Sequence, residues 1–99
     1  MKSKHINKYV IIRADRAGVF AGTLKSKDGS EVKLTNARRI YYWSGSASLS
    51  QLAREGVKNP IECKFAMPLD EITILGVIEI IPVTSLAEKN INAVPVWKK

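Results

Sequence analysis

The first half of the chain alternates apolar and polar positions in a way that predicts three consecutive β-strands. Residues 9–14 and 19–25 are apolar runs rich in β-branched side chains, and residues 15–18 form a turn between them. The Asp-Gly pair at 28–29 predicts a tight hairpin before a third, long strand over residues 32–43. These elements together make a three-stranded meander.

Two short helices are predicted in the second half. Ser46 or Ser48 caps the first helix, which ends at Gly56, where a left-handed residue is expected. The second helix opens on a capping box, with Ser85 as the cap and Glu88 three residues later.

Two further apolar segments predict the fourth and fifth strands. Residues 61–67 alternate apolar and polar positions, which makes Cys63 a buried thiol. Residues 72–83 are apolar on both faces, so the second face is covered by the helices or by another subunit. The terminal segment 93–97 is apolar and docks on its own chain or on a neighbour. We expect a homo-oligomer whose interface contains Leu75, Val77, Ile81 and Trp97.

These elements predict a mainly β fold with short helices. The expected architecture is a small five-stranded, strongly bent antiparallel sheet or an SH3/Sm-like barrel, with one helix after the third strand and one near the C-terminus. A strand as long as the third usually bends, so we expect a bulge at Thr35-Asn36. The chain is one domain over residues 9–97, with a flexible basic tail at 1–8 and a basic end at 98–99.

The net charge of +7 is concentrated outside the predicted domain. Residues 9–97 hold 11 basic and 9 acidic residues, a net of +2, and no predicted element carries the basic stripe expected of a duplex-DNA groove. The tails either keep the chain in solution or attract polyanions in a salt-dependent way. They contain five of the 16 basic residues: Lys2, Lys4, Lys8, Lys98 and Lys99.

The inventory of reactive side chains argues against catalysis. His5 is the only histidine and lies in the predicted tail, so a histidine-based nucleophile or metal site has no material. The single cysteine, Cys63, forms no internal disulfide. There is no 18-residue apolar run, and a membrane-spanning helix is therefore not predicted. We expect a cytoplasmic protein that is not an enzyme and has no catalytic residues, metal or cofactor.

The stretch ARRIYYWSGSASLSQ, residues 37–51, carries the most side-chain chemistry and favours binding. On an extended strand, Arg39, Tyr41 and Trp43 share one side, where they can stack a flat ring and pair an anion. The loop after the strand offers hydroxyl and backbone N–H groups to an anion, unless its serines only cap the helix. The aromatic strand itself is alternatively buried against the C-terminal segment. The predicted ligand-binding residues are Asn36, Arg38, Arg39, Tyr41, Tyr42, Trp43, Ser44, Gly45, Ser46 and Ser48.

The run AGVFAGTLKSKDGSEVKLTNARRIYYWSGSASLSQLAREGVKNP, followed by ITILGVIEIIPVT and VPVW, resembles a family of small uncharacterised proteins of tailed phages and prophages, a domain of unknown function. The resemblance implies expression in a bacterial host cell and carries no activity. The hairpin over residues 18–34 is similar in pattern to the first hairpins of Sm-like barrels, which assemble into rings and bind RNA.

Three functions follow as expectations. The first is a homo-oligomer that holds a small anionic nucleotide-type ligand, which would sequester a host immune signal. The second is a module that binds single-stranded RNA or DNA on a basic, aromatic surface. The third is a phage protein that inhibits a host protein by direct contact.

Overall fold

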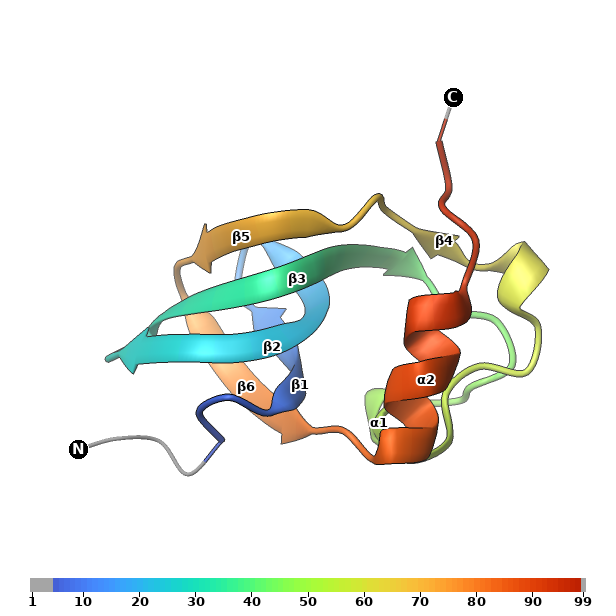
Figure 1. The fold of residues 1–99 in the computed structure, drawn as a ribbon, viewed down its shortest axis with the longest axis horizontal. Coiled ribbons are helices and arrows are strands. Elements are labelled where there is room, and N and C mark those ends of the chain that lie inside the picture. Colours follow the sequence, from blue (N-terminus) through green and yellow to red (C-terminus); the bar gives the residue numbers. More distant parts are fainter. Residues whose placement is uncertain (1–4, 99) are drawn as a thin grey trace.

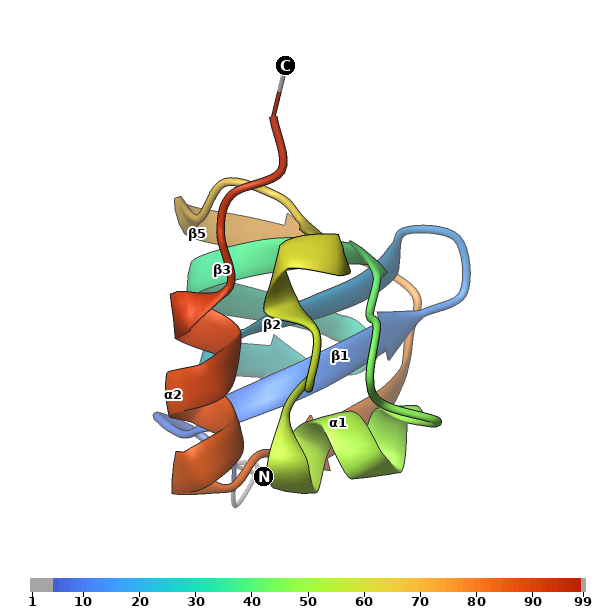
Figure 2. The same ribbon diagram turned by 90° about the vertical axis from the view of Figure 1, so that its right-hand side faces the viewer.

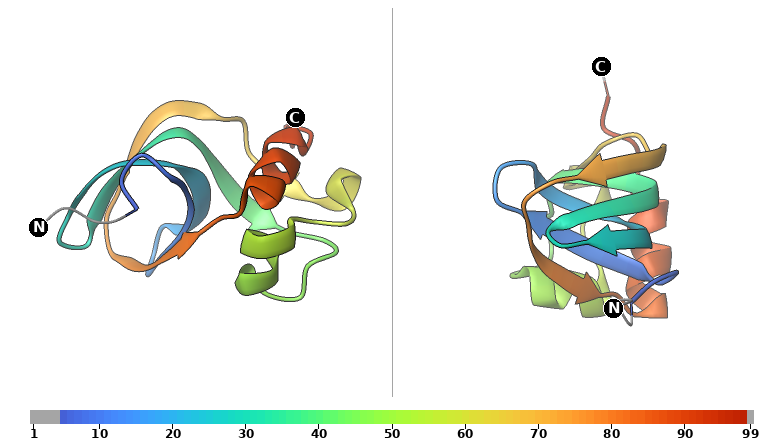
Figure 3. Two further views of the ribbon diagram at one scale, coloured as in Figure 1. Left: turned by 60° about the horizontal axis from the view of Figure 1, so that its bottom comes forward. Right: turned by 90° about the vertical axis from the view of Figure 1, so that its left-hand side faces the viewer.

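Six antiparallel strands form one strongly curved sheet in residues 5–98, the part of the chain that this computed structural model describes (Figure 1). The strands are β1 (Tyr9–Ala14), β2 (Gly18–Asp28), β3 (Glu31–Tyr42), β4 (Lys64–Phe65), β5 (Leu69–Ile74) and β6 (Val77–Pro82). Their order is β4-β3-β2-β1-β6, and β5 pairs with β3 along the same edge as β4. The sheet curls so far that β5 and β6, on opposite edges, are joined by a short turn (Figure 3).

Local signals account for the long β2–β3 hairpin. Gly29 adopts a φ of 59° in the two-residue turn, so that Asp28 pairs with Glu31. The predicted bulge in β3 is confirmed, because Asn36 has a φ of 49° and the register with β2 shifts there. Opposite the bulge, a Cβ on Gly22 would lie 3.0 Å from the carbonyl oxygen of Thr35, and glycine permits this close approach.

The sheet is buried on both faces, and each face has its own core. One face carries a cluster made only of strand residues, the strand core: Val10, Ile12, Ala14, Phe20, Leu24, Val32, Leu34, Ala37 and Ile74. On the other face, α1 (Leu49–Glu55) and α2 (Ser85–Ala93) cover the sheet (Figure 2). Residues of the two helices, of the strands beneath them and of the adjoining segments form a second cluster, the helix core. Its members are Tyr9, Ile11, Ala21, Ile40, Leu52, Ala53, Val57, Cys63, Phe65, Ile91 and Val94. β1 contributes to both clusters, which explains its nearly unbroken apolar sequence.

The mainly β class with one helix after the third strand and one near the C-terminus is confirmed, but the predicted strand count is wrong. The predicted strand over residues 72–83 is two strands, because the chain turns at Leu75 and at Gly76, whose φ is 72°. The predicted strand over 61–67 shortens to β4, because Pro60–Glu62 forms a 3₁₀ turn (η1). The sheet is therefore open and six-stranded, rather than five-stranded.

The helix caps are partly as predicted. The Ser48 hydroxyl accepts a hydrogen bond from the Gln51 N–H, and Gly56 ends α1 with a φ of 78°. The cap of α2 is Thr84 rather than the predicted Ser85, since the Thr84 hydroxyl accepts from the Ala87 N–H at 3.1 Å. The same hydroxyl donates to the Arg54 carbonyl, so it joins the two helices. This second bond is tertiary, and the helix sequence alone does not indicate it.

Both ends of the described chain contact the domain. Ile6 packs against the strand core, and the Asn7 N–H donates to the Leu24 carbonyl at 2.7 Å. At the other end, the Trp97 N–H donates to the Phe65 carbonyl at 2.9 Å, so the terminal segment docks on its own chain. The predicted basic positions 1–4 and 99 lie outside the described residues. Within 5–98, no helix is long and apolar enough to cross a membrane.

Candidate functional site

A pocket of about 250 Å³ opens between β3 and the segment that leads from β4 into β5, and we call it the Arg39 pocket. Its walls are apolar apart from one guanidinium and one phenol. The volume lies just below the usual range for ligand pockets, about 300–1,000 Å³, and has room for one ring system. The lining residues are Phe20, Ala37, Arg39, Tyr41, Ala66, Met67, Leu69 and Ile72.

The pocket forms because the chain opposite β3 contains an extra residue. The Ala66 N–H donates to the Arg39 carbonyl at 2.8 Å, whereas Leu69 pairs with Ala37. Three steps along the segment therefore face two steps along β3, and the segment arches away from the strand. Met67 and Leu69, at the arch, are about half exposed although they are large and apolar.

Arg39 is the only charged residue that lines this pocket. Its guanidinium carbon lies 4.8 Å from the centroid of the Phe20 ring, in a cation–π contact. The Nε atom is buried and has no hydrogen-bond partner among residues 5–98. Arg39 takes no part in the two ion pairs of residues 5–98, which are Arg13–Glu79 and Lys25–Glu71. An unpartnered buried donor is costly, and a hydrogen-bond acceptor beside it would remove that cost.

Arg38, the neighbouring arginine, has a different environment. It is 2% exposed and lies on the helix-covered face, where its guanidinium donates hydrogen bonds at 2.8–3.4 Å. The acceptors are the carbonyl oxygens of Phe65, Ala66, Ile91, Val94 and Pro95. Burial lowers the pKa of Arg38 from its usual value, and burial also raises the pKa of the nearby Tyr9 phenol. Because its N–H groups donate to carbonyls inside the fold, Arg38 stabilises the fold and is not part of the candidate site.

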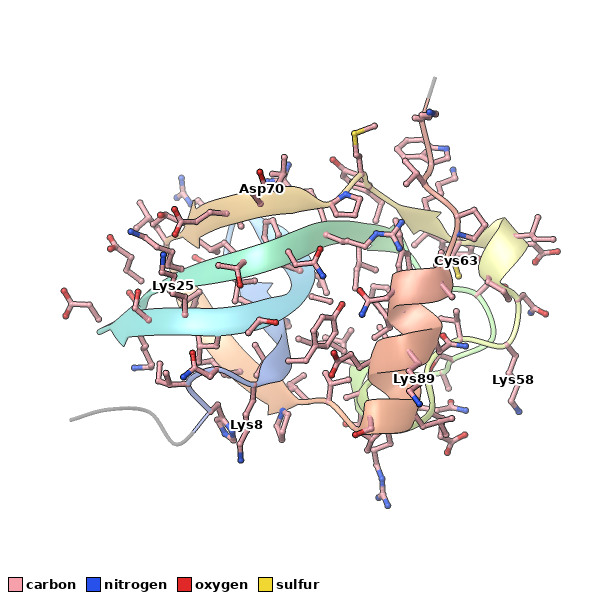
Figure 4. All side chains as sticks on the ribbon, in the orientation of Figure 1. Lys8, Lys25, Lys58, Cys63, Asp70 and Lys89 are labelled. Carbon is pink, nitrogen blue, oxygen red and sulfur yellow. The ribbon has the colours of Figure 1, made fainter. Side chains whose placement is uncertain are left out.

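The loop over residues 44–48 does not line the pocket, and several of its polar groups have partners within the fold. The Ala47 N–H donates to the Gln51 side chain at 2.8 Å, and Ser48 caps α1. Ser44 contacts Glu62 through its hydroxyl and donates its N–H to the Cys63 thiol. Figure 4 labels Cys63 beside η1, and this thiol is buried as predicted.

Gly45 and Ser46 complete this account of the loop. A Cβ on Gly45 would lie 2.6 Å from the backbone nitrogen of Lys58, so glycine is needed where the loop crosses the chain after α1. The Ser46 hydroxyl donates to the Ser48 carbonyl at 3.5 Å. The alternative interpretation, that the loop residues shape and cap the start of α1, is the one that these contacts support.

Three other predicted site residues do not line the pocket. Trp43 follows the end of β3 and packs against the helix core, so it does not continue the row of Arg39 and Tyr41. Tyr42 is half exposed, and Asn36 is exposed at the bulge. The structure therefore brings Arg39 and Tyr41 together in one pocket and separates them from the other eight predicted residues.

The predicted interface residues do not form one continuous face. Leu75 is exposed in the turn between β5 and β6. Val77 packs against the strand core and Ile81 against the helix core, so their own chain covers part of both. Trp97 lies elsewhere, against the Tyr41 ring, with ring centroids 5.5 Å apart.

Sequence reasoning missed the residues that complete the Arg39 pocket. Phe20, Ala37 and Ile72 come from three strands that meet only in the folded sheet. A local signal did exist in the segment Met67-Pro68-Leu69. Two large apolar residues flank a proline at the end of the predicted strand over residues 61–67, and adjacent exposed apolar side chains can mark a binding groove.

The fold and pocket define a small mainly β domain with two covering helices and a single-arginine pocket. The chain belongs to a family described as a domain of unknown function (DUF6948), whose sequence model matches residues 7–91. The predicted resemblance to a domain of unknown function is thereby confirmed. A search of curated proteins gives no match to the chain.

Proposed function

We propose that this chain is a non-enzymatic binding protein that holds a small anionic, nucleotide-type ligand in the Arg39 pocket. The observation that supports it best is the buried Arg39 Nε without a hydrogen-bond partner in residues 5–98, set in an otherwise apolar pocket. Apolar walls receive a flat ring, and the guanidinium pairs with a phosphate or carboxylate attached to it. Neither group alone accounts for both halves of the pocket.

The ring and the anionic group of such a ligand would contact different parts of the pocket. The ring would lie between the arch at Met67 and the strand residue Ala37, with Tyr41 at the rim. Phe20 faces the guanidinium carbon of Arg39, and Arg39 as a whole is only partly buried, so its terminal nitrogen atoms would pair with an anion at the mouth. Hydrogen bonds to a charged partner contribute about 1.5–3 kcal/mol each, which makes Arg39 the main determinant of affinity.

The test is a calorimetric titration of the full chain with AMP, adenosine and inorganic phosphate. We expect AMP to bind, and adenosine and phosphate to bind at least 10-fold more weakly, because each fills only half of the pocket. Arg39→Gln should lower the affinity for AMP about 10- to 100-fold. Arg16→Gln, in the exposed β1–β2 turn, makes the same change of net charge and should leave binding unaltered.

Two results would contradict the proposal. One is the absence of binding at millimolar concentration for all four common nucleoside monophosphates. The other is equal loss of affinity in Arg39→Gln and Arg16→Gln, which would indicate general charge attraction rather than a site.

The origin and assembly of the chain belong to the same proposal. The sequence resemblance supports a tailed-phage or prophage source, and a non-catalytic nucleotide binder from such a source would sequester a host signal. The strongly curved sheet supports, as a finer assignment, a relationship to SH3- or Sm-like barrels. Native mass spectrometry of the protein from a phage-infected host tests the assembly. The total mass gives the number of subunits, and any additional mass gives the number of ligands bound to the homo-oligomer.

A further inference from the structure

The C-terminal segment docks beside the Arg39 pocket through contacts with Phe65 and Arg38. Val96 forms a parallel bridge with Phe65, and the Trp97 N–H donates to the Phe65 carbonyl. Arg38 of β3 donates to the carbonyl oxygens of Val94 and Pro95 and so connects the segment to the sheet. Although the segment has no regular secondary structure, these contacts fix its backbone as far as Trp97 on the domain.

Trp97 is held beside the pocket and remains accessible. Its ring meets the Tyr41 ring edge-on, with centroids 5.5 Å apart and an interplanar angle of 66°. Tyr41 is 54% exposed and Trp97 44% exposed, so neither ring is part of a core. Tyr41 also lines the Arg39 pocket, and the two rings therefore form one surface that continues from the pocket mouth.

A second cation accompanies the second ring. The Lys64 Nζ lies 5.5 Å from the centroid of the Trp97 ring, and Lys64 takes no part in the two ion pairs of residues 5–98. Lys64 lies in β4, and Ala66 follows the end of that strand while still hydrogen-bonded to the Arg39 carbonyl of β3. In such an extended segment, side chains two residues apart point to the same face. Ala66 lines the pocket, so Lys64 stands one position farther along the surface that Arg39 begins.

We infer that the ligand of this site is a single-stranded dinucleotide unit, or a longer single strand, rather than a mononucleotide. One base occupies the Arg39 pocket and the next stacks on Trp97, while Arg39 and Lys64 attract the phosphates. This inference rests on the proposed function and deepens it by naming the ligand class. Aromatic stacking with unpaired cations is the chemistry by which proteins hold single strands without reading their sequence.

The experiment compares ligands that differ only in length: 5′-phosphorylated deoxyadenosine oligomers of one, two and four units, titrated into the full chain by calorimetry. The dinucleotide should bind at least 10-fold more tightly than the mononucleotide, a difference of about 1.4 kcal/mol. Trp97→Ala should remove that gain and leave mononucleotide affinity unchanged. Tyr42→Ala is the matched control, since Tyr42 is a similarly exposed aromatic residue outside this surface.

Two further measurements test the positions of the second base and of the phosphate. Tryptophan emission should be quenched by the dinucleotide and not by the mononucleotide, and Trp97→Phe should abolish the quenching while keeping the fold, as followed by circular dichroism. Lys64→Gln should reduce the slope of log affinity against log salt by about 0.7 for the four-unit strand.

The outcomes separate the two proposals. If the mononucleotide binds in an Arg39-dependent way but the dinucleotide binds no more tightly, this inference fails and the proposed function stands. An equal loss in Trp97→Ala and Tyr42→Ala would also overturn the inference. If no oligomer length binds, the proposed function fails and this inference fails with it.

Discussion

Arg38 and Arg39 are neighbours in β3, yet one is the most enclosed charge of the described chain and the other has a free donor. Arg38 donates hydrogen bonds to five backbone carbonyls from the β4–β5 region, α2 and the C-terminal segment. Arg39, on the opposite face, has a cation–π contact with the Phe20 ring and a buried Nε without a partner in residues 5–98. Their separation follows from strand alternation, but the use of each follows from what packs against its face.

This contrast separates a cation whose donors the fold uses from a cation that keeps an unused donor. A guanidinium whose donors are all used inside the fold stabilises that fold and has nothing left for a ligand. A guanidinium on an apolar wall with an unused donor costs the fold stability, which a bound anion would restore. Substitutions on the two faces should therefore act on different properties.

The largest expected effect is that of Arg38→Met. The variant leaves buried carbonyls of α2 and the terminal segment without donors, and the free energy of unfolding should fall by about 3–4 kcal/mol. Urea denaturation measures it. Arg13→Met, which removes a surface pair with Glu79, should cost less than about 1 kcal/mol. Similar losses in the two variants would erase the distinction between the faces.

Removing residues 95–99 should have a smaller effect on the same face. The truncation eliminates one acceptor of Arg38 and the Trp97–Phe65 hydrogen bond, so the free energy of unfolding should decrease by about 1–2 kcal/mol. A chain that ends at Trp97 keeps both contacts and serves as the control. If the control loses as much stability, charge at the end rather than these bonds is responsible.

The Tyr9 phenol, which lies on the Arg38 face, should give a pH dependence. Burial raises its pKa in the folded chain above the ordinary value of 10.0, so the folded state holds this proton more tightly than the unfolded state. Its stabilising contribution is therefore complete below pH 10 and lost as the pH rises beyond it. Above pH 10, the wild type should lose up to about 1.4 kcal/mol per pH unit more than Tyr9→Phe, as measured by denaturation at each pH. Parallel curves for the two proteins would contradict this.

The smallest expected effect on stability is that of Arg39→Met. The variant exchanges a cation–π contact with Phe20 for apolar packing and removes the unpartnered Nε, so the free energy of unfolding should change by no more than about 0.5 kcal/mol. Thermal and urea denaturation both report it. A loss above about 1.5 kcal/mol would give Arg39 a structural role and weaken the proposed site.

Much of the local structure was predictable because its causes are local. Gly29 forms the hairpin turn, Ser48 and Gly56 bound α1, and Asn36 bulges, each through backbone preferences of the residues concerned. Thr84 was missed as the cap of α2, because a threonine and a serine in sequence both fit the pattern. Contact with Arg54 occurs only in the folded chain.

The sequence by itself determined the mainly β class, the two helices, the buried thiol of Cys63 and the position of Arg39 and Tyr41 on one side of a strand. Only the tertiary structure decided which arginine is available and what completes its pocket. The acceptors of Arg38 lie 27 to 57 residues away in the chain, and the walls of the Arg39 pocket come from β2, β3, β5 and the arch before β5. Alternation along a strand separates the two side chains into opposite faces, but it contains no information about which face the helices and the terminal segment will cover.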